Sequence, residues 1–168
     1  MNRKVKLLII AGPTGSGKSE LAVKAARLLD GEIISVDSMQ VYRHFDIGTA
    51  KPTRRMMEEI PHHLINIAKP DERFTMWDFR VAAQKAIEGI SARNKTALLV
   101  GGTGLYMKTL LENLDGGAKP DPQLRAELNE ELTTKGLPFL YKKLQAANPE
   151  KAEKIHPNDK HRILRALE

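Results

Sequence analysis

The sequence contains no cysteine among its 168 residues. This absence excludes disulfide bonds, thiolate catalysis and cysteine-bound zinc. No apolar run approaches the roughly eighteen residues of a membrane-spanning helix. The apolar part of the N-terminal stretch MNRKVKLLIIAGPTG is too short for a signal peptide and leads directly into a glycine-rich stretch. We therefore expect a cytoplasmic protein with no membrane partner.

Acidic residues are outnumbered by basic ones. The chain carries 27 Lys and Arg against 21 Asp and Glu, a formal charge of +6. This balance favours an anionic partner, although phosphates, nucleic acid and simple solubility all fit it. The length suits one well-buried domain, alone or with a small appendage.

A glycine-rich stretch, GPTGSGKS, fits the pattern G-x-x-x-x-G-K-[ST] and lies between an apolar run and a helical pattern. In such a loop the backbone N–H groups surround phosphates, Lys18 reaches the outer phosphates, and the Ser19 hydroxyl can hold Mg²⁺. The start of the following helix adds partial positive charge. The alternative is a glycine-rich turn with an accidental lysine. The predicted phosphate-binding residues are Gly12, Pro13, Thr14, Gly15, Ser16, Gly17, Lys18 and Ser19.

Short apolar runs at 5–11, 32–36 and 96–100 predict buried parallel strands, and 62–67 predicts a further short strand. Adjacent His62 and His63 point to opposite sides of such a strand, so a structural role is favoured over a metal pair. Thr75 with Asp78 resembles a capping box that opens a helix. We predict an α/β domain over residues 1–114, a P-loop NTPase-like parallel sheet flanked by helices.

Two strand ends carry candidate chemistry. Asp37 follows the second strand, and ligands of open α/β sheets bind outside the carboxyl ends of the strands. Its carboxylate can contact Mg²⁺ through water, act as a general base, or cap the next turn. The stretch Gly101–Gly104 follows another strand and leaves the Thr103 hydroxyl available, although a tight turn would explain it equally well. No aspartate follows that strand, which counts against a plain ATPase.

A stretch rich in glycine and proline, DGGAKPDP, begins at Asp115 and marks the predicted domain boundary. Residues 115–168 form the second predicted domain, a small helical appendage with helices over 122–135, 138–147, 149–156 and 161–168. Its basic face either contacts a polyanion or is a solvated helix surface. The basic residues are Lys142, Lys143, Lys160, Arg162 and Arg165. Because the chain ends inside a helical pattern, we expect a longer protein.

Several stretches, taken in order, closely resemble the tRNA dimethylallyltransferases, also called tRNA isopentenylpyrophosphate transferases. They are GPTGSGKS, EIISVDSMQVY, DIGTAKPT, PHHLI, LVGGTGLY, and HPND with RALE, and the likeness runs over residues 7–168. The resemblance implies transfer of a dimethylallyl group from dimethylallyl diphosphate to the exocyclic amine of the adenine 3′ of the anticodon in tRNA. The diphosphate of the donor, rather than ATP, would then lie on the phosphate loop.

The resemblance also implies roles for residues of this chain. Asp37 would be the general base, Lys18 and Mg²⁺ on Ser19 would neutralise the departing diphosphate, and Thr103 with Thr14 would position the reactants. The implied contacts with the tRNA anticodon stem-loop come from Asp37, Ser38, Met39, Gln40, Thr103, Arg125, His161, Arg162, Ile163, Leu164 and Arg165. We expect a monomer. Since family members continue beyond RALE, we expect weak or no transferase activity from these 168 residues alone.

Three other functions remain open from the residues. The first is a related enzyme that prenylates free adenine nucleotides. The second is a small-molecule kinase that binds ATP on the phosphate loop, although no clear arginine-rich lid is present. The third is an RNA-binding module that retains the phosphate loop only to bind a stabilising anion.

Overall fold

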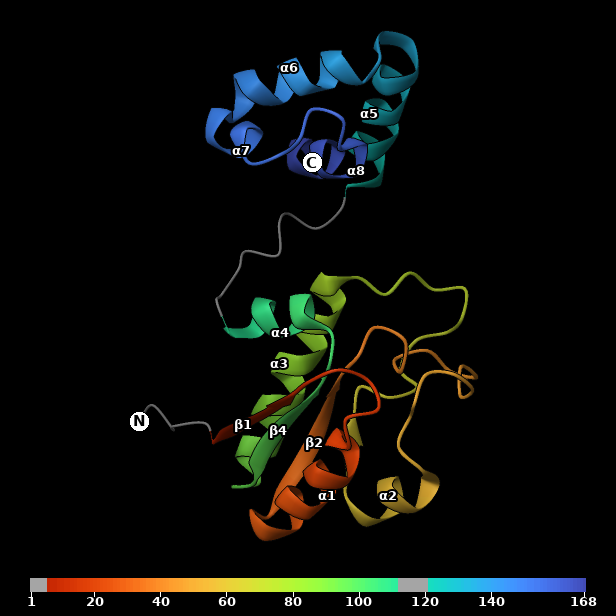
Figure 1. Cartoon of the computed structure of the whole chain (residues 1–168), viewed down its shortest axis with the longest axis vertical. Helices are drawn as coiled ribbons and strands as arrows, with labels where there is room; N and C mark the ends of the chain where they lie inside the picture. The colour runs from red at the N-terminus through yellow and green to blue at the C-terminus, as the bar shows by residue number, and fades with distance from the viewer. Residues whose placement is uncertain (1–5, 112–120) are drawn as a thin grey trace. The chain divides into compact units, whose positions relative to one another are not determined.

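The computed structural model describes residues 6–111 and 121–168 (Figure 1). Contacts divide the chain into two compact units, Met1–Gly116 and Gly117–Glu168, which we call the core unit and the helical unit. The domain boundary predicted after residue 114 lies outside the described residues. Within the described residues, no helix is both long and apolar enough to cross a membrane.

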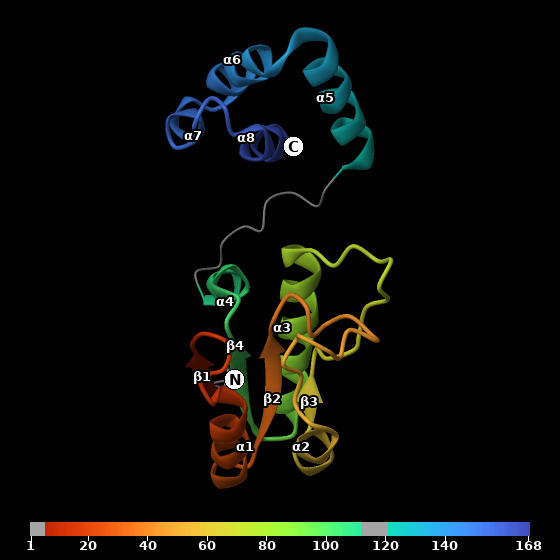
Figure 2. The same cartoon turned by 45° about the vertical axis from the view of Figure 1, so that its right-hand side comes forward.

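The core unit contains a parallel sheet of four strands in the order β1-β4-β2-β3 (Figure 2). The strands are β1 (Leu7–Ala11), β2 (Gly31–Val36), β3 (His62–His63) and β4 (Thr96–Gly101). β2 is buried along its whole length, as a central strand of a covered parallel sheet should be. The predicted α/β architecture is confirmed. The strand predicted over 62–67 stops after His63, because Leu64 leaves the extended region with a φ of 63°.

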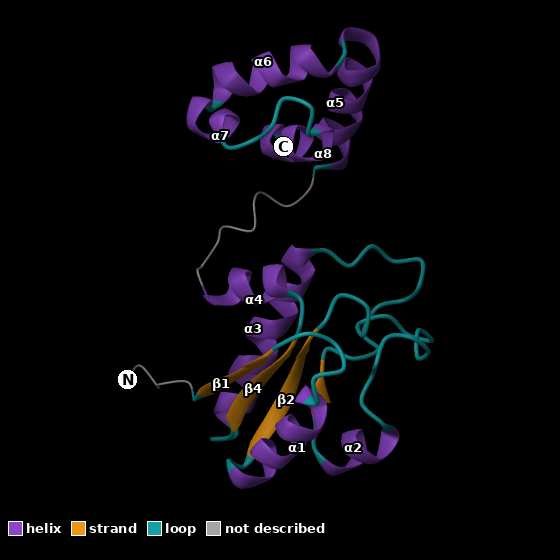
Figure 3. Cartoon of the chain, viewed as in Figure 1, coloured by secondary structure: helices purple, strands orange, loops and turns teal. Residues whose placement is uncertain are grey.

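Helices cover both faces of this sheet (Figure 3). They are α1 (Lys18–Leu28), α2 (Arg54–Glu59), α3 (Met76–Ala92) and α4 (Gly104–Leu111). Alternate residues of β2 face opposite layers: Ile33 packs in a cluster with α1, whereas Ile34 packs in a cluster with α3. The predicted capping box opens α3, since Thr75 Oγ1 accepts from Asp78 N and Asp78 Oδ2 accepts from Thr75 N. Two layers of apolar side chains thus hold the strand ends in place.

The helical unit consists of α5 (Pro122–Lys135), α6 (Leu137–Ala147), α7 (Pro149–Glu153) and α8 (Lys160–Leu167). Side-chain oxygens cap three of these helices. Asp121 caps α5, Asn148 caps α7, and Asp159 accepts from Arg162 N at 3.0 Å to begin α8. The aspartate of the HPND stretch is therefore a helix cap. α7 ends at Glu153, three residues earlier than the sequence predicts.

Candidate active site

The phosphate loop connects β1 to α1 in the manner that its sequence predicts. Gly15 and Gly17 adopt φ values of 82° and 77°, which a side chain rarely tolerates. The Lys18 ammonium contacts Pro13 O and lies 3.4 Å from Ser16 Oγ. The lysine therefore folds back over the loop, where it can meet a phosphate bound by the backbone N–H groups.

A pocket of about 330 Å³ opens beside this loop. Residues 14–20 of the loop and of α1 line one part of it, and residues 49–53 line another. The strands contribute Ile33, Ser35 and Asp37 from β2 and the turn after it, and residues 100–102 at the end of β4. The pocket therefore lies at the carboxyl ends of β2 and β4, where ligands of parallel sheets bind.

Asp37 shows one of its three predicted uses, the cap of the next turn. Its Oδ1 accepts hydrogen bonds from Met39 N at 2.8 Å and from Gln40 N at 3.2 Å, which caps the turn after β2. Among the described residues, its Oδ2 has no hydrogen-bond donor. Because the residue lines the pocket, one oxygen fixes the carboxylate and the other remains available to a ligand.

The glycine turn after β4 packs against the end of β2. A Cβ on Gly101 would lie 2.1 Å from Val36 O, so no other residue fits between these strands. Thr103 N donates to Val36 O, and Thr103 Oγ1 accepts from Ser38 N, both at 3.2 Å. These bonds bring the predicted residue Thr103 against Ser38, directly beside Asp37.

Gln40 lines the pocket with its side chain already engaged. Its Oε1 accepts from Ser35 Oγ at 2.8 Å, and its Nε2 donates to Thr49 O and Ala50 O at 3.1 Å each. These bonds hold residues 49–50 against the end of β2. A contact between the Gln40 amide and adenine would have to replace them. Met39, beside it, is 44% exposed.

The adjacent histidines take different environments, as the alternation of a strand predicts. His63 Nε2 lies 2.7 Å from Glu32 Oε2, a structural contact away from the pocket. His62 lines the pocket, and its Nδ1 lies 2.7 Å from Ile60 O. Burial lowers the pKa of His62 and outweighs the opposite effect of the Ile60 carbonyl, which favours a neutral ring.

The pocket contains residues that could help to hold Mg²⁺. The described residues hold no group of three or more His, Asp or Glu that could bind a metal by themselves. Ser19 and Asp37 nevertheless line the same pocket. A hydroxyl, a carboxylate and the oxygens of a bound diphosphate suit Mg²⁺, which usually combines few protein ligands with phosphates and water. The residues therefore fit a metal that arrives with its phosphate ligand.

Two of the predicted tRNA contacts are corrected in the helical unit. Ile163 and Leu164 are 0% and 1% exposed, because they belong to the apolar cluster that holds α5, α6 and α8 together. Their side chains are therefore core residues. The hydrophobic spacing of RILRAL already indicated this burial, because apolar residues on one face of an amphipathic helix pack against a core.

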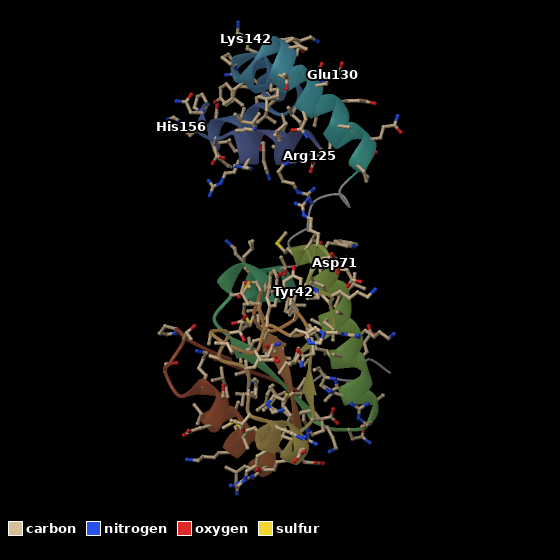
Figure 4. The ribbon with its side chains drawn as sticks, turned by 90° about the vertical axis from the view of Figure 1, so that its right-hand side faces the viewer. Tyr42, Asp71, Arg125, Glu130, Lys142 and His156 are labelled. Carbon is tan, nitrogen blue, oxygen red and sulfur yellow. The ribbon has the colours of Figure 1, made fainter. Side chains whose placement is uncertain are left out.

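The other predicted contacts of this unit divide into paired and exposed side chains. Arg125 Nη1 lies 2.5 Å from Glu168 Oε1, and Arg165 Nη1 lies 2.8 Å from Glu168 Oε2. His161 is exposed, and the Arg162 side chain is 72% exposed with Asp159 at 3.5 Å. Figure 4 labels Arg125, Lys142 and His156 among the polar side chains of the unit.

Sequence reasoning missed several residues that line the pocket. Ser35, Thr49, Ala50 and Lys51 were not assigned a role, and His62 was given only a structural one, although all five contribute to its lining. The stretches EIISV, DIGTAKPT and PHHLI contain them and belong to the family resemblance, but neither spacing nor residue type alone assigns them a function.

Comparisons with known proteins identify the family. The IPP transferase profile matches residues 40–168, and the isopentenyl transferase profile matches residues 5–67. A relative from Geotalea uraniireducens, tRNA dimethylallyltransferase 2, is 51% identical over 98% of this chain and 53% of its own length. The tRNA dimethylallyltransferase of Syntrophobacter fumaroxidans is 50% identical over 96% of this chain and 47% of its own. The chain thus spans about half the length of these relatives.

Solved structures agree with this result. The full-length tRNA isopentenylpyrophosphate transferase of Bacillus halodurans is 44% identical, with a TM-score of 0.66 over 98% of this chain and 55% of that one. A eukaryotic dimethylallyltransferase acting on tRNA is 35% identical, with a TM-score of 0.80 over 96% of this chain and 40% of that one. The family predicted from the sequence is confirmed: this chain belongs to the IPP transferases.

Proposed function

We propose that this chain provides the donor site for transfer of a dimethylallyl group from dimethylallyl diphosphate to the exocyclic amine of the adenine 3′ of the anticodon in tRNA. The observation that carries this proposal is a single pocket lined by the phosphate loop and by Asp37, in a chain of the IPP transferase family. The relatives named tRNA dimethylallyltransferase support the choice of substrates.

The reaction assigns a step to each of these groups. The lone pair of the adenine amine forms a bond to C1 of the dimethylallyl group, while the bond from C1 to the diphosphate oxygen breaks and its electron pair leaves with the diphosphate. Asp37 Oδ2 accepts the proton released by the amine. Lys18 and the backbone N–H groups of the loop stabilise the charge on the departing diphosphate. Thr103 and Thr14 keep the two reactants aligned for displacement.

A Mg²⁺ ion, when bound, supplies additional positive charge to the diphosphate. Ser19 and, through water, Asp37 would hold it. The loop backbone and Lys18 still contact the diphosphate directly. Removing the metal with a chelator should therefore weaken diphosphate affinity without abolishing it, which calorimetry can measure independently of turnover.

In the helical unit, we assign the contact with the anticodon stem-loop to exposed basic side chains rather than to Ile163 and Leu164. His161 and Arg162 at the start of α8, with Lys142 and Lys160, are exposed. Basic side chains of this kind bind phosphates of nucleic acid without reading sequence. Arg125 and Arg165 stabilise the fold through Glu168 and come second in this assignment.

The test is transfer of radiolabelled dimethylallyl diphosphate to unmodified tRNA, with Asp37→Asn and Asp71→Asn compared in parallel. Asp71 is an exposed aspartate outside the pocket lining and is therefore the matched control. We expect Asp37→Asn to bind tRNA normally and to lower transfer at least about a hundredfold, the usual contribution of a general base. Equal transfer by Asp37→Asn and the control would contradict the proposed role.

The same assay separates the alternatives. Transfer to AMP but not to tRNA would identify an enzyme of free nucleotides. Transfer of the γ-phosphate of ATP to a small acceptor would identify a kinase. Tight tRNA binding with equal affinity for dimethylallyl diphosphate and pyrophosphate would identify a binding module, whereas an absence of transfer alone is also expected if these 168 residues are incomplete.

A further inference from the structure

Lys51 is a buried lysine whose ammonium contacts three separate parts of the core unit. Its side chain is 6% exposed. Nζ donates to Tyr42 O at 2.7 Å, to Asp46 Oδ1 at 2.8 Å and to Asn66 Oδ1 at 2.7 Å. An ammonium group has three hydrogen-bond donors, so all three are used inside the protein.

These acceptors lie on segments that do not otherwise form regular structure. Residues 40–43, which follow Asp37, run beside residues 66–68, with Asn66 N bonded to Gln40 O at 3.1 Å and Ile67 N to Val41 O at 2.8 Å. Lys51 contacts both of these segments. It also contacts Asp46, which lies in the loop between residues 43 and 51. The ammonium therefore adds three hydrogen bonds to the backbone bonds that join these segments.

The loop ordered in this way is part of the pocket. Residues 49–53 line the pocket together with the phosphate loop, and Gln40 holds Thr49 O and Ala50 O from the β2 side. By contrast, the Lys18 ammonium contacts only Pro13 O and Ser16 Oγ among the described residues. The phosphate loop and residues 49–53 thus depend on different side chains for their positions.

We infer that Lys51 is a positioning residue for the prenyl donor: it fixes residues 49–53 as the part of the pocket that contacts the donor beyond its phosphates. This inference rests on the proposed function. Because its three donors are already used, Lys51 does not act as a phosphate ligand. A ligand whose diphosphate occupies the phosphate loop must extend toward the remaining lining, to which residues 49–53 contribute.

The inference separates two ligands that share the same diphosphate. Inorganic pyrophosphate needs only the phosphate loop, whereas dimethylallyl diphosphate also needs the rest of the pocket. We expect Lys51→Met to weaken the affinity for dimethylallyl diphosphate about tenfold, as expected for a few lost hydrogen bonds, and to change that for pyrophosphate by less than about twofold. Isothermal titration calorimetry measures both affinities. Lys69→Met, whose side chain is 66% exposed, is the matched control and should change neither.

Two further variants keep the test decisive if Lys51→Met folds poorly. Asp46 is 67% exposed, so Asp46→Asn removes one charged partner of Lys51 without opening a cavity, and should weaken donor affinity in the same direction but less. Lys51→Cys introduces the only thiol of the chain, which 2-bromoethylamine can alkylate in denaturant. After refolding, the attached aminoethyl group replaces the lysine ammonium and should restore donor affinity.

The outcomes distinguish this inference from the proposed function. A selective loss of donor affinity that aminoethylation reverses supports the role of Lys51. Two results would overturn this role and leave the proposed function unaffected. The first is an equal donor affinity in Lys51→Met, Asp46→Asn and the control. The second is an equal loss of affinity for dimethylallyl diphosphate and pyrophosphate. If the unsubstituted chain binds neither ligand, the proposed function fails and this inference fails with it.

Discussion

The core unit and the helical unit use polar side chains in different ways. In the core unit, hydrogen bonds from separate strands and loops fix single atoms beside the pocket, as Ser35 and Thr103 do for Gln40 and Ser38. In the helical unit, an apolar cluster carries the fold, and basic side chains such as Arg162 lie outside it. Under the proposed function, chemistry in the core unit would therefore depend on individual atoms, whereas RNA binding by the helical unit would depend on summed charge and an intact core.

The largest expected effect tests how closely the core unit is packed at its strand ends. Gly101→Ala would place a Cβ 2.1 Å from Val36 O, so β2 and β4 must move apart. We expect a loss of about 4 kcal/mol in the free energy of unfolding of the core unit. Gly104→Ala, where no atom lies within 4 Å of the added Cβ, is the control and should stay within about 0.5 kcal/mol. Hydrogen exchange resolved by segment measures both; unchanged protection in Gly101→Ala would contradict this packing.

The corresponding test of the helical unit removes apolar volume. Leu144 is 0% exposed in its cluster, so Leu144→Ala should destabilise this unit by about 3 kcal/mol. The neighbouring exposed position gives the control, Gln145→Ala. If the two units unfold independently, protection in the core unit should not change. A loss of protection in both units would show that they unfold together.

A third test addresses the single-atom character of the core unit. Lys18→Ala removes the ammonium that lies over the phosphate loop, and should weaken pyrophosphate binding about thirtyfold, or about 2 kcal/mol. Lys24→Ala on the exposed side of α1 is the control. Binding of an anticodon stem-loop to the helical unit should be the same in both variants. Equal pyrophosphate affinity in the two variants would show that Lys18 does not contact the bound diphosphate.

Both units contain a carboxylate that lies beside two basic side chains, and this shared feature gives a pH test. In the core unit, burial raises the pKa of Glu32. Hydrogen bonds with Arg93 and His63 lower this pKa by a larger amount, so the net pKa is lowered. In the helical unit, burial raises the pKa of Glu168, and Arg165 and Arg125 likewise produce a net lowering.

A lowered folded-state pKa stabilises the fold above the ordinary value of 4.5, and this contribution disappears as the pH falls through the lowered pKa. Glu32→Gln should therefore reduce the acid dependence of stability in the core unit alone, and Glu168→Gln in the helical unit alone. Unit-resolved hydrogen exchange between neutral and acidic pH measures this. Identical pH profiles for both variants and the unsubstituted chain would contradict the role of these ion pairs.

The smallest expected effect belongs to the proposed RNA-binding surface. Arg162→Ala removes one exposed charge and should weaken stem-loop binding by at most about 1 kcal/mol, while reducing the slope of log affinity against log salt by about 0.7 to 0.9. Gln145→Ala changes no charge and is the control. An unchanged slope in Arg162→Ala would place the RNA on another surface.

The sequence was most informative where one short pattern specifies one structure. The phosphate loop, the strand before Asp37 and the capping box at Thr75 each depend on local spacing, and the structure has all three. The strand predicted from His62 ended after two residues, because Leu64 takes a positive φ and the following Asn66 N and Ile67 N donate to Gln40 O and Val41 O, which are distant in sequence. The roles of Ile163 and Leu164 were assigned from family likeness, although their apolar character favoured burial.

The hydrogen bonds of Lys51 and Gln40 could not be predicted from the sequence for a similar reason. Their hydrogen-bond partners are mainly backbone carbonyls and side chains of loops, such as Ala50 O and Asn66 Oδ1. Loop conformations of this kind depend on tertiary packing, which no local spacing encodes.

In the proposed function, the phosphate loop holds the diphosphate of the prenyl donor while Asp37 receives the proton of the tRNA amine. A crystal structure with an unreactive thio-analogue of dimethylallyl diphosphate and an anticodon stem-loop tests it most directly. We predict the diphosphate on residues 12–19, in contact with Lys18, and the adenine amine within hydrogen-bond distance of Asp37 Oδ2. A diphosphate bound elsewhere, or an adenine lying away from Asp37, would contradict the account.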